Sequence, residues 1–229
     1  MRRATTLLTM PFAWSSLIVT VVAVLLGFAL GWWPLAAWTE RSMTGERMPR
    51  RTLRLTAAIT TAVVFGVLAW RFGLSWTLPA LLAFAACATV LSIVDLAEKR
   101  LPNAVVFPAL GAVAVLLVPA TWATGIWMSL VWALVGSAAM FAVYFVLALI
   151  SPSSMGMGDV KLALVIGLLL GWFGMSAWLV GLLAAFVVGG VIAIVALVLK
   201  RVTLRGSIPF GPSMLVGALI AVLLVGPVG

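Results

Sequence analysis

The chain has 229 residues, of which 65% are apolar and 8% are charged, whereas soluble domains average about 45–50% apolar and about 25% charged residues. This composition is that of a protein that resides in a bilayer. Because a spanning helix takes about 20 apolar residues, little sequence remains for a soluble domain. The net charge of +9 raises nucleic acid and acidic lipid as partners, but the basic residues fall between apolar runs, where they set membrane orientation. We therefore expect contact with membrane lipid and none with nucleic acid.

The residue inventory excludes several kinds of active site. The chain has no histidine, which rules out a Ser-His triad, a His-paired cysteine and an HExxH zinc site. The single cysteine, Cys87, lies inside an apolar run, so neither a disulfide nor a CxxC zinc site forms within the chain. We expect no metal and no cofactor.

In chain order, eight apolar runs are separated by charged residues, proline or glycine, and they predict an all-α polytopic transmembrane bundle of about eight spans. The runs cover residues 11–38, 55–70, 74–96, 103–119, 125–150, 159–174, 175–199 and 209–228. Four tryptophans fall near the ends of these runs, where an amphipathic ring prefers the membrane interface. They are Trp122, Trp127, Trp172 and Trp178.

The basic residues divide unequally between the two sides that eight spans define. One side has Arg2, Arg3 and Arg71, and the other has eleven of the fourteen: Arg41, Arg47, Arg50, Arg51, Arg54, Lys99, Arg100, Lys161, Lys200, Arg201 and Arg205. The positive-inside rule places the eleven in the cytoplasm and both termini outside. We expect no cleaved signal peptide, because the first run is too long and no small-residue cleavage site follows it.

The two aspartates of the chain are predicted to lie at one depth. The third run travels inward and ends at Asp95, and the sixth begins at Asp159 and travels outward. A charged side chain inside a span costs several kcal/mol, about 3 on insertion scales, so such groups face the bundle interior or a wet cavity. Two plainer interpretations stay open: Asp95 pairs with Lys99 four residues on, and Asp159 caps the helix that it begins.

If the two carboxyl groups meet, repulsion and burial favour one shared proton. The ionised member then takes a proton from a water molecule, the protonated member hydrogen-bonds a carbonyl oxygen, and the water attacks that carbonyl. The flanking residues suit such a site. Gly156 and Gly158 permit close approach of another chain, Ser151–Ser154 break the fifth helix at the interface, and Pro102 favours a turn into the next span.

Three motifs occur in order over about residues 90–228: Asp95 with Leu101-Pro102-Asn103, then Gly156-Met157-Gly158-Asp159 with Lys161, then Ile208-Pro209-Phe210-Gly211-Pro212 before the last apolar run. In this the sequence resembles the type IV prepilin peptidases, which are polytopic aspartic proteases of the GxGD kind.

The resemblance implies a bacterial inner-membrane endopeptidase that removes a short basic leader, after a glycine, from prepilin or pseudopilin precursors at the cytoplasmic face. It implies that Asp95 and Asp159 form the catalytic dyad and that Lys161 helps to balance the charge of the site. The residues Gly156, Gly158, Pro102, Asn103, Pro209, Phe210, Gly211 and Pro212 would shape the site or bind substrate. The alternative for the last four is a Pro-Gly turn that starts the last span. Glu98 either attracts a basic leader or pairs with Arg100 or Lys99.

The sequence departs from the longer members of that family. Those carry a large cytoplasmic loop with paired zinc-binding cysteines and an N-methyltransferase activity that uses S-adenosylmethionine. Here the corresponding loop, residues 39–54, is short, rich in arginine and without cysteine, so zinc binding and methylation are not expected. We expect one integral membrane peptidase domain over residues 1–229 with a catalytic core over about 74–228.

Other functions remain open from the residues alone. Paired carboxylates also occur in ion or proton transporters, although a relay requires acidic groups through the bilayer. A Ser-Lys hydrolase would use Ser153 or Ser154 with Lys161, and a purely structural membrane protein would need none of these. Gly167 and Gly171 have the spacing of a helix-packing motif, which leaves the oligomeric state open.

Overall fold

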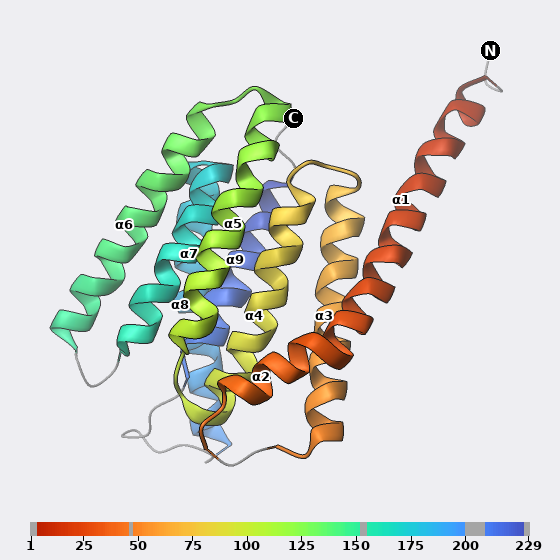
Figure 1. Cartoon of the computed structure of the whole chain (residues 1–229). Coiled ribbons are helices and arrows are strands. Elements are labelled where there is room, and N and C mark those ends of the chain that lie inside the picture. Colours follow the sequence, from red (N-terminus) through yellow and green to blue (C-terminus); the bar gives the residue numbers. More distant parts are fainter. Residues whose placement is uncertain (1–3, 46–47, 152–154, 200–208, 227–229) are drawn as a thin grey trace.

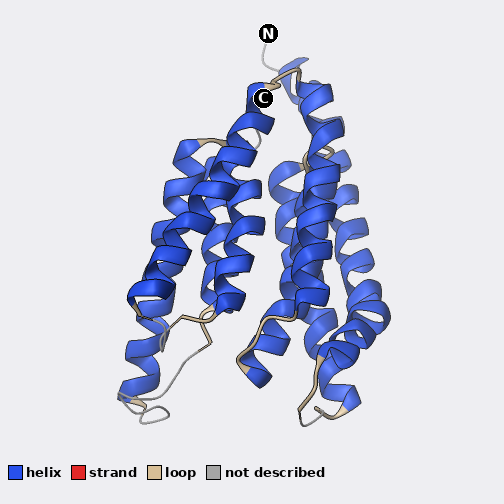
Figure 2. Ribbon diagram, turned by 60° about the vertical axis from the view of Figure 1, so that its left-hand side comes forward, coloured by secondary structure: helices blue, strands red, loops and turns tan. Residues whose placement is uncertain are grey.

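The computed structural model describes residues 4–45, 48–151, 155–199 and 209–226, and within these ranges every element of secondary structure is a helix. The helices run along one another, and their connections lie at the two ends of the bundle (Figures 1 and 2). The helices are α1 (Ala4–Leu30), α2 (Ala36–Ser42), α3 (Arg50–Phe72), α4 (Leu78–Glu98), α5 (Asn103–Thr124), α6 (Met128–Ile150), α7 (Met157–Phe173), α8 (Met175–Val198) and α9 (Gly211–Val225). The predicted all-α bundle is confirmed, and each of the eight apolar runs is helical over most of its length.

The helices differ in their capacity to cross a membrane. Six helical segments are long and apolar enough by length and composition: Ser15–Ser42, Arg50–Phe72, Leu78–Glu98, Asn103–Thr124, Met128–Ile150 and Met175–Val198. The other two, α7 with 17 residues and α9 with 15, are shorter than the roughly 20 residues that a bilayer requires. α7 lies in the interior of the bundle, whereas α9 packs against α4, α7 and α8 and leaves residues such as Val216 and Leu224 exposed.

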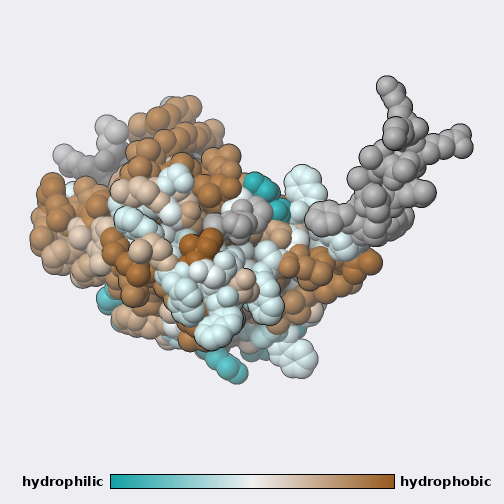
Figure 3. Space-filling model, turned by 90° about the horizontal axis from the view of Figure 1, so that it is seen from above, coloured by the Kyte–Doolittle hydropathy of each residue, from teal (hydrophilic) through white to brown (hydrophobic). Residues whose placement is uncertain are grey.

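α7 is the central helix of the bundle. It contacts α5, α6, α8 and α9, and from Leu162 to Phe173 nearly all of its residues are buried. α4 contacts α5 and α9, so both α5 and α9 lie against α4 and against α7. Seen along the bundle from the end where α1 begins, strongly apolar residues gather at the rim and paler, more polar ones at the centre (Figure 3).

The first helix changes its winding where it passes α3. Between α1 and α2 the segment Gly31–Leu35 forms a π-helical turn that contains Pro34. Proline lacks an N–H and interrupts the regular α-helical hydrogen bonds. Gly31 faces the backbone of Ala57 and Ala58 so closely that a Cβ atom would collide with it. The glycine therefore permits the contact between this segment and α3.

The loop predicted over residues 39–54 is shorter than expected. α2 continues to Ser42 and α3 begins at Arg50, so Arg41, Arg51 and Arg54 lie on helix ends rather than in a loop. Residues 46–47 are outside the described ranges.

The tryptophans predicted at the interface divide into two kinds. Trp122 and Trp127 are exposed and contact each other edge to face, with ring centroids 5.7 Å apart. Trp172 and Trp178 are instead buried, and their indole N–H groups donate to Thr121 Oγ1 at 2.8 Å and to the Gly136 carbonyl at 2.9 Å. For these two, packing inside the bundle outweighs the interfacial preference.

Candidate active site

Asp95 lies in the last turn of α4, and 4% of its surface is exposed. α4 ends here because Lys99 adopts the left-handed conformation, with φ of 52°, and its N–H donates to the Asp95 carbonyl at 2.8 Å. The chain then turns through Leu101 and Pro102, and α5 begins at Asn103. The predicted break at Pro102 is observed as the position just before the new helix.

The carboxylate of Asp95 accepts a hydrogen bond from the first residue of α9. The Gly211 N–H donates to Asp95 Oδ2 at 3.0 Å. The free N–H groups at a helix N-terminus and the helix dipole both favour an anion at this place. A Cβ atom on Gly211 would lie 2.7 Å from the same carboxylate oxygen. Glycine therefore allows the backbone of α9 to approach the acid directly.

Asp159 lies in the first turn of α7, and 9% of its surface is exposed. Its Oδ2 accepts the Gly156 N–H at 3.3 Å, while the Asp159 N–H donates to the Gly156 carbonyl at 3.1 Å. The capping role considered for Asp159 is thus observed. Only one of its two carboxylate oxygens is used in that bond.

The side chain of Leu101 links the three motifs. Its atoms lie 3.0 Å from where a Gly158 Cβ would be and 3.3 Å from where a Gly211 Cβ would be. Leu101 follows Asp95, Gly158 precedes Asp159, and Gly211 contacts Asp95. The three motifs, far apart in the sequence, therefore meet around one buried aliphatic side chain.

Asp159 lies within electrostatic range of both Asp95 and Tyr144. Such interactions are stronger where water is excluded, and these two aspartates are the buried charged side chains within the described ranges. Ion pairs in the same ranges join Arg50 with Glu40 and Arg100 with Glu98, so neither aspartate has a salt-bridge partner there.

Lys161 contacts another predicted site residue. Its Nζ donates to Asn103 Oδ1 at 3.1 Å, which connects the first turns of α7 and α5 beside the aspartates. Ser153 and Ser154, the nucleophiles considered with Lys161, lie outside the described ranges. Pro212 is the second residue of α9, a position where proline fits because its missing N–H would have no partner.

Glu98 holds the segment between α2 and α3 beside the site. Its Oε1 accepts the backbone N–H groups of Thr44 and Gly45, at 2.7 and 2.6 Å, and its other oxygen pairs with Arg100. Arg100 in turn donates to the Ser42 carbonyl at 2.6 Å. Of the two interpretations of Glu98, the pairing with Arg100 is observed. Its anchoring of residues 44–45 had no signal in the sequence, because the partners are backbone groups more than 50 residues away.

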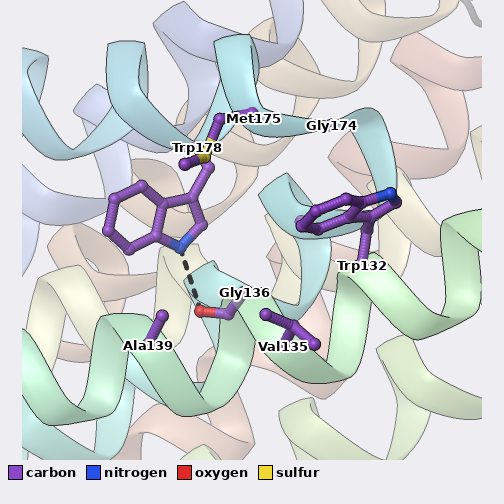
Figure 4. Close-up of a pocket in the computed structure, with 8 residues that line it drawn as sticks. Trp132, Val135, Gly136, Ala139, Gly174, Met175 and Trp178 are labelled. Carbon is purple, nitrogen blue, oxygen red and sulfur yellow. Dashed lines mark hydrogen bonds between the residues drawn. The ribbon is translucent and has the colours of Figure 1, made fainter.

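The structure has apolar cavities away from the aspartates. One, between α6 and the junction of α7 with α8, is lined by residues that include Trp132, Gly136, Met175 and Trp178 (Figure 4). It lies at the Gly171 end of α7, twelve residues or about 18 Å of helix from Asp159. A groove lined by α3, α4 and α9 includes Ser92, one turn before Asp95. Within the described ranges, no three His, Cys, Asp or Glu residues gather as a metal site.

Comparison with known proteins identifies the central part of the chain. Residues 82–194, which include both aspartates, match the Type IV leader peptidase family. This chain carries a type IV leader peptidase domain. The family resemblance predicted from the three motifs is confirmed, although Pro209–Pro212 lie beyond the matched residues.

Proteins named prepilin leader peptidase/N-methyltransferase resemble this chain over most of its length. One from Stutzerimonas stutzeri is 29% identical over 72% of this chain and 56% of its own length. Others from Pseudomonas aeruginosa and Bacillus subtilis are 28% identical, over 80% and 73% of this chain and 60% and 64% of their own lengths. The chain thus spans about three fifths of the length of these curated relatives. No solved structure matches the chain significantly.

Proposed function

We propose that this chain is a membrane-embedded aspartic endopeptidase that removes the leader from prepilin or pseudopilin precursors. The support from relatives is the leader peptidase domain over residues 82–194. The observation that supports the chemistry is the pair Asp95 and Asp159: two buried carboxylates at one end of the bundle, within electrostatic range, with three motifs around them.

The reaction would use one proton and one water molecule. One carboxylate takes a proton from the water, whose oxygen attacks the carbonyl carbon of the scissile peptide bond, while the other carboxyl group hydrogen-bonds the carbonyl oxygen. The tetrahedral intermediate then collapses as the C–N bond breaks and the amine leaves with a proton from the dyad. The N–H groups of Gly211 and Gly156 would hold the two carboxylates in place through one oxygen each. The second oxygen of each carboxylate would then contact the water or the substrate.

We further propose that the site faces the cytoplasm of a bacterial inner membrane. Asp95 lies in the last turn of α4 and Asp159 in the first turn of α7. These helix ends lie at the end of the bundle where α2 ends and α3 begins, opposite the start of α1 and the end of α9 (Figure 1). The end of α2 and the start of α3 carry Arg41, Arg50, Arg51 and Arg54. The positive-inside rule assigns the arginine-rich end to the cytoplasm. Residues 1–229 would act as one domain with its catalytic core over 74–228.

Methylation is not part of the proposal. The relatives' printed names include N-methyltransferase, but the connection between α2 and α3 here is residues 43–49, and the one cysteine, Cys87, is buried in α4. The large cysteine-containing loop that the family resemblance implies for longer members has no counterpart between these helices.

The other functions have less support. A proton relay through the bilayer requires acidic groups at several depths, but the buried carboxylates within the described ranges lie at one end. In a Ser-Lys hydrolase the lysine activates the serine, whereas Lys161 donates to Asn103. A structural protein has no need for two buried acids that influence each other.

Co-expression with a prepilin tests the proposal. We expect the native chain to shorten the precursor by its leader, and Asp95→Asn or Asp159→Asn to lower that rate by about 10³-fold or more, since general acid–base groups contribute about 10²–10⁴-fold. Asparagine keeps the size and hydrogen-bonding capacity of the side chain. Cleavage at the native rate by either folded variant would refute the dyad.

Glu40→Gln supplies a matched control. Glu40 is an acid that pairs with Arg50 at 3.2 Å on the surface, outside the site. We expect this variant to process the precursor normally. If Lys161→Ala lost more activity than Asp95→Asn, the Ser-Lys reaction would replace the proposed one.

A further inference from the structure

Phe210, the residue before α9, lies in an aromatic cluster formed by three helices. Its ring centroid is 6.3 Å from that of Tyr144 on α6 and 5.5 Å from that of Phe186 on α8. Tyr144 and Phe186 also stack on each other, 5.9 Å apart with their planes 14° from parallel. All three separations fall in the range of favourable aromatic contacts, about 4.5–7 Å.

The ring of Phe210 also packs against α8, at Gly189, a position without a side chain. A Cβ atom on Gly189 would lie 2.6 Å from Cε2 of Phe210 and 3.1 Å from its Cδ2. The glycine therefore lets the ring lie against the helix backbone. Tyr144 and Phe186 contact the half-buried ring as well, so an added methyl group at Gly189 would push the ring out of its present contacts.

What the cluster fixes is the start of α9. Gly211 follows Phe210 directly, and its N–H donates to Asp95 Oδ2 at 3.0 Å. The peptide unit that joins Phe210 to Gly211 is planar, so the Gly211 N–H moves with the backbone of Phe210, the residue whose ring the cluster contacts. Tyr144 is 1% exposed and lies within electrostatic range of Asp159, while the Gly211 N–H connects the cluster to Asp95.

From this geometry we infer that Phe210 is a positioning residue for the dyad: the cluster of Tyr144, Phe186 and Gly189 holds its ring, and the ring sets the Gly211 N–H on Asp95. The inference rests on the proposed function for its effect on cleavage. The hydrogen bond that it concerns exists whether or not that function holds.

The sharpest test adds one methyl group at either of two adjacent glycines of α8. Gly189→Ala pushes the ring of Phe210, whereas a Cβ on Gly190 meets nothing within 4 Å. We expect Gly189→Ala to lower kcat for leader cleavage at least about tenfold with KM nearly unchanged, since small misplacements at a reacting site cost up to about 10²-fold. Gly190→Ala should stay within about twofold of the native enzyme.

A second variant separates positioning from simple misfolding. In a Phe210→Leu background the smaller side chain leaves room for the added methyl group. There, Gly189→Ala should lower kcat by about twofold or less relative to Phe210→Leu alone. A coupling of this kind between two residues in contact is what a double-mutant cycle measures. An equal loss in both backgrounds, or equal losses for Gly189→Ala and Gly190→Ala, would overturn the inference.

Hydrogen exchange at the Gly211 amide gives a readout that needs no substrate. Measured by mass spectrometry on the full chain in detergent, it should become at least about tenfold faster in Gly189→Ala than in Gly190→Ala, because an amide without its acceptor loses protection. Unchanged exchange would refute the positioning role even if cleavage is normal. Absence of cleavage by the native chain, with exchange behaving as expected, would instead count against the proposed function alone.

Discussion

A backbone amide, not a side chain, is the donor that the structure provides to Asp95. The donor can approach the carboxylate because Gly211 has no Cβ, and Asp95 and Leu101 both lie close to the position that a Cβ would occupy. The glycine of the Pro-Phe-Gly-Pro segment thus has a specific physical role, beyond starting a helix.

We predict that Gly211→Ala lowers leader cleavage about 10- to 100-fold, because the new methyl would lie 2.7 Å from Asp95 Oδ2 and must displace the carboxylate or α9. Initial rates of prepilin cleavage in detergent would measure the loss. Gly111→Ala on α5, where a Cβ meets nothing within 4 Å, is the matched control. Native activity in Gly211→Ala would mean that the close approach has no bearing on the reaction.

At this scale the sequence indicated the polar residues of the candidate site and, among its apolar residues, Phe210, but it gave no reason to select Tyr144 or Phe186. Asp95, Asp159 and Lys161 are conspicuous because charge is rare in apolar runs. Leu101, Tyr144 and Phe186 look like ordinary core residues, and their roles come from partners on other helices. Only the chemical type of a residue can be read from one sequence, and contacts across helices cannot.

Among the helices, α6 and α7 pack against each other through glycine. A Cβ on Gly167 would collide with the Gly136 carbonyl and lie 2.6 Å from Met140 Cβ, and Gly171 faces the backbone at Trp132 in the same way. The helix-packing spacing of Gly167 and Gly171 is therefore used inside the chain, where small residues let two backbones approach.

We predict that Gly167→Ala destabilises the bundle by about 1–3 kcal/mol, the usual cost of overpacking a tight interior. Helical circular dichroism during unfolding in a denaturing detergent would measure it. In the open position of Gly111, alanine should be neutral or stabilising by up to about 1 kcal/mol. A Gly167→Ala variant as stable as the native chain would show that the interface can widen at no cost.

The sequence predicted these elements well in kind and less well at their limits. Hydrophobic runs identified each of the longer helices in the described ranges, but α2 extends to Ser42, into the predicted loop over residues 39–54. The early start of α3 at Arg50 and the π-helical turn at Gly31–Leu35 were not predicted. Helix ends depend on tertiary contacts such as Glu98 with residues 44–45, and these join segments more than 50 residues apart.

For the whole molecule, the unequal distribution of arginine and lysine gives a testable orientation. We predict that an impermeant maleimide labels Met157→Cys, beside Asp159, only from the cytoplasmic side, and Trp122→Cys only from outside. Both positions are exposed, and the single native cysteine, Cys87, is buried, so a Cys87→Ala background leaves one reactive thiol in each variant. Labelling of Met157→Cys in intact cells would reverse the proposed topology.

The order in which a ribosome makes this chain adds a constraint. Asp95 is synthesised 116 residues before the amide that it accepts from, and that amide arrives only with α9, the last of the described helices. A nascent chain that has released α4 but not yet α9 therefore lacks this donor to Asp95, one acid of the proposed dyad. If the proposal holds, proteolytic activity would begin only after α9 has been synthesised and packed, so that the membrane would contain no active protease during synthesis of the preceding helices.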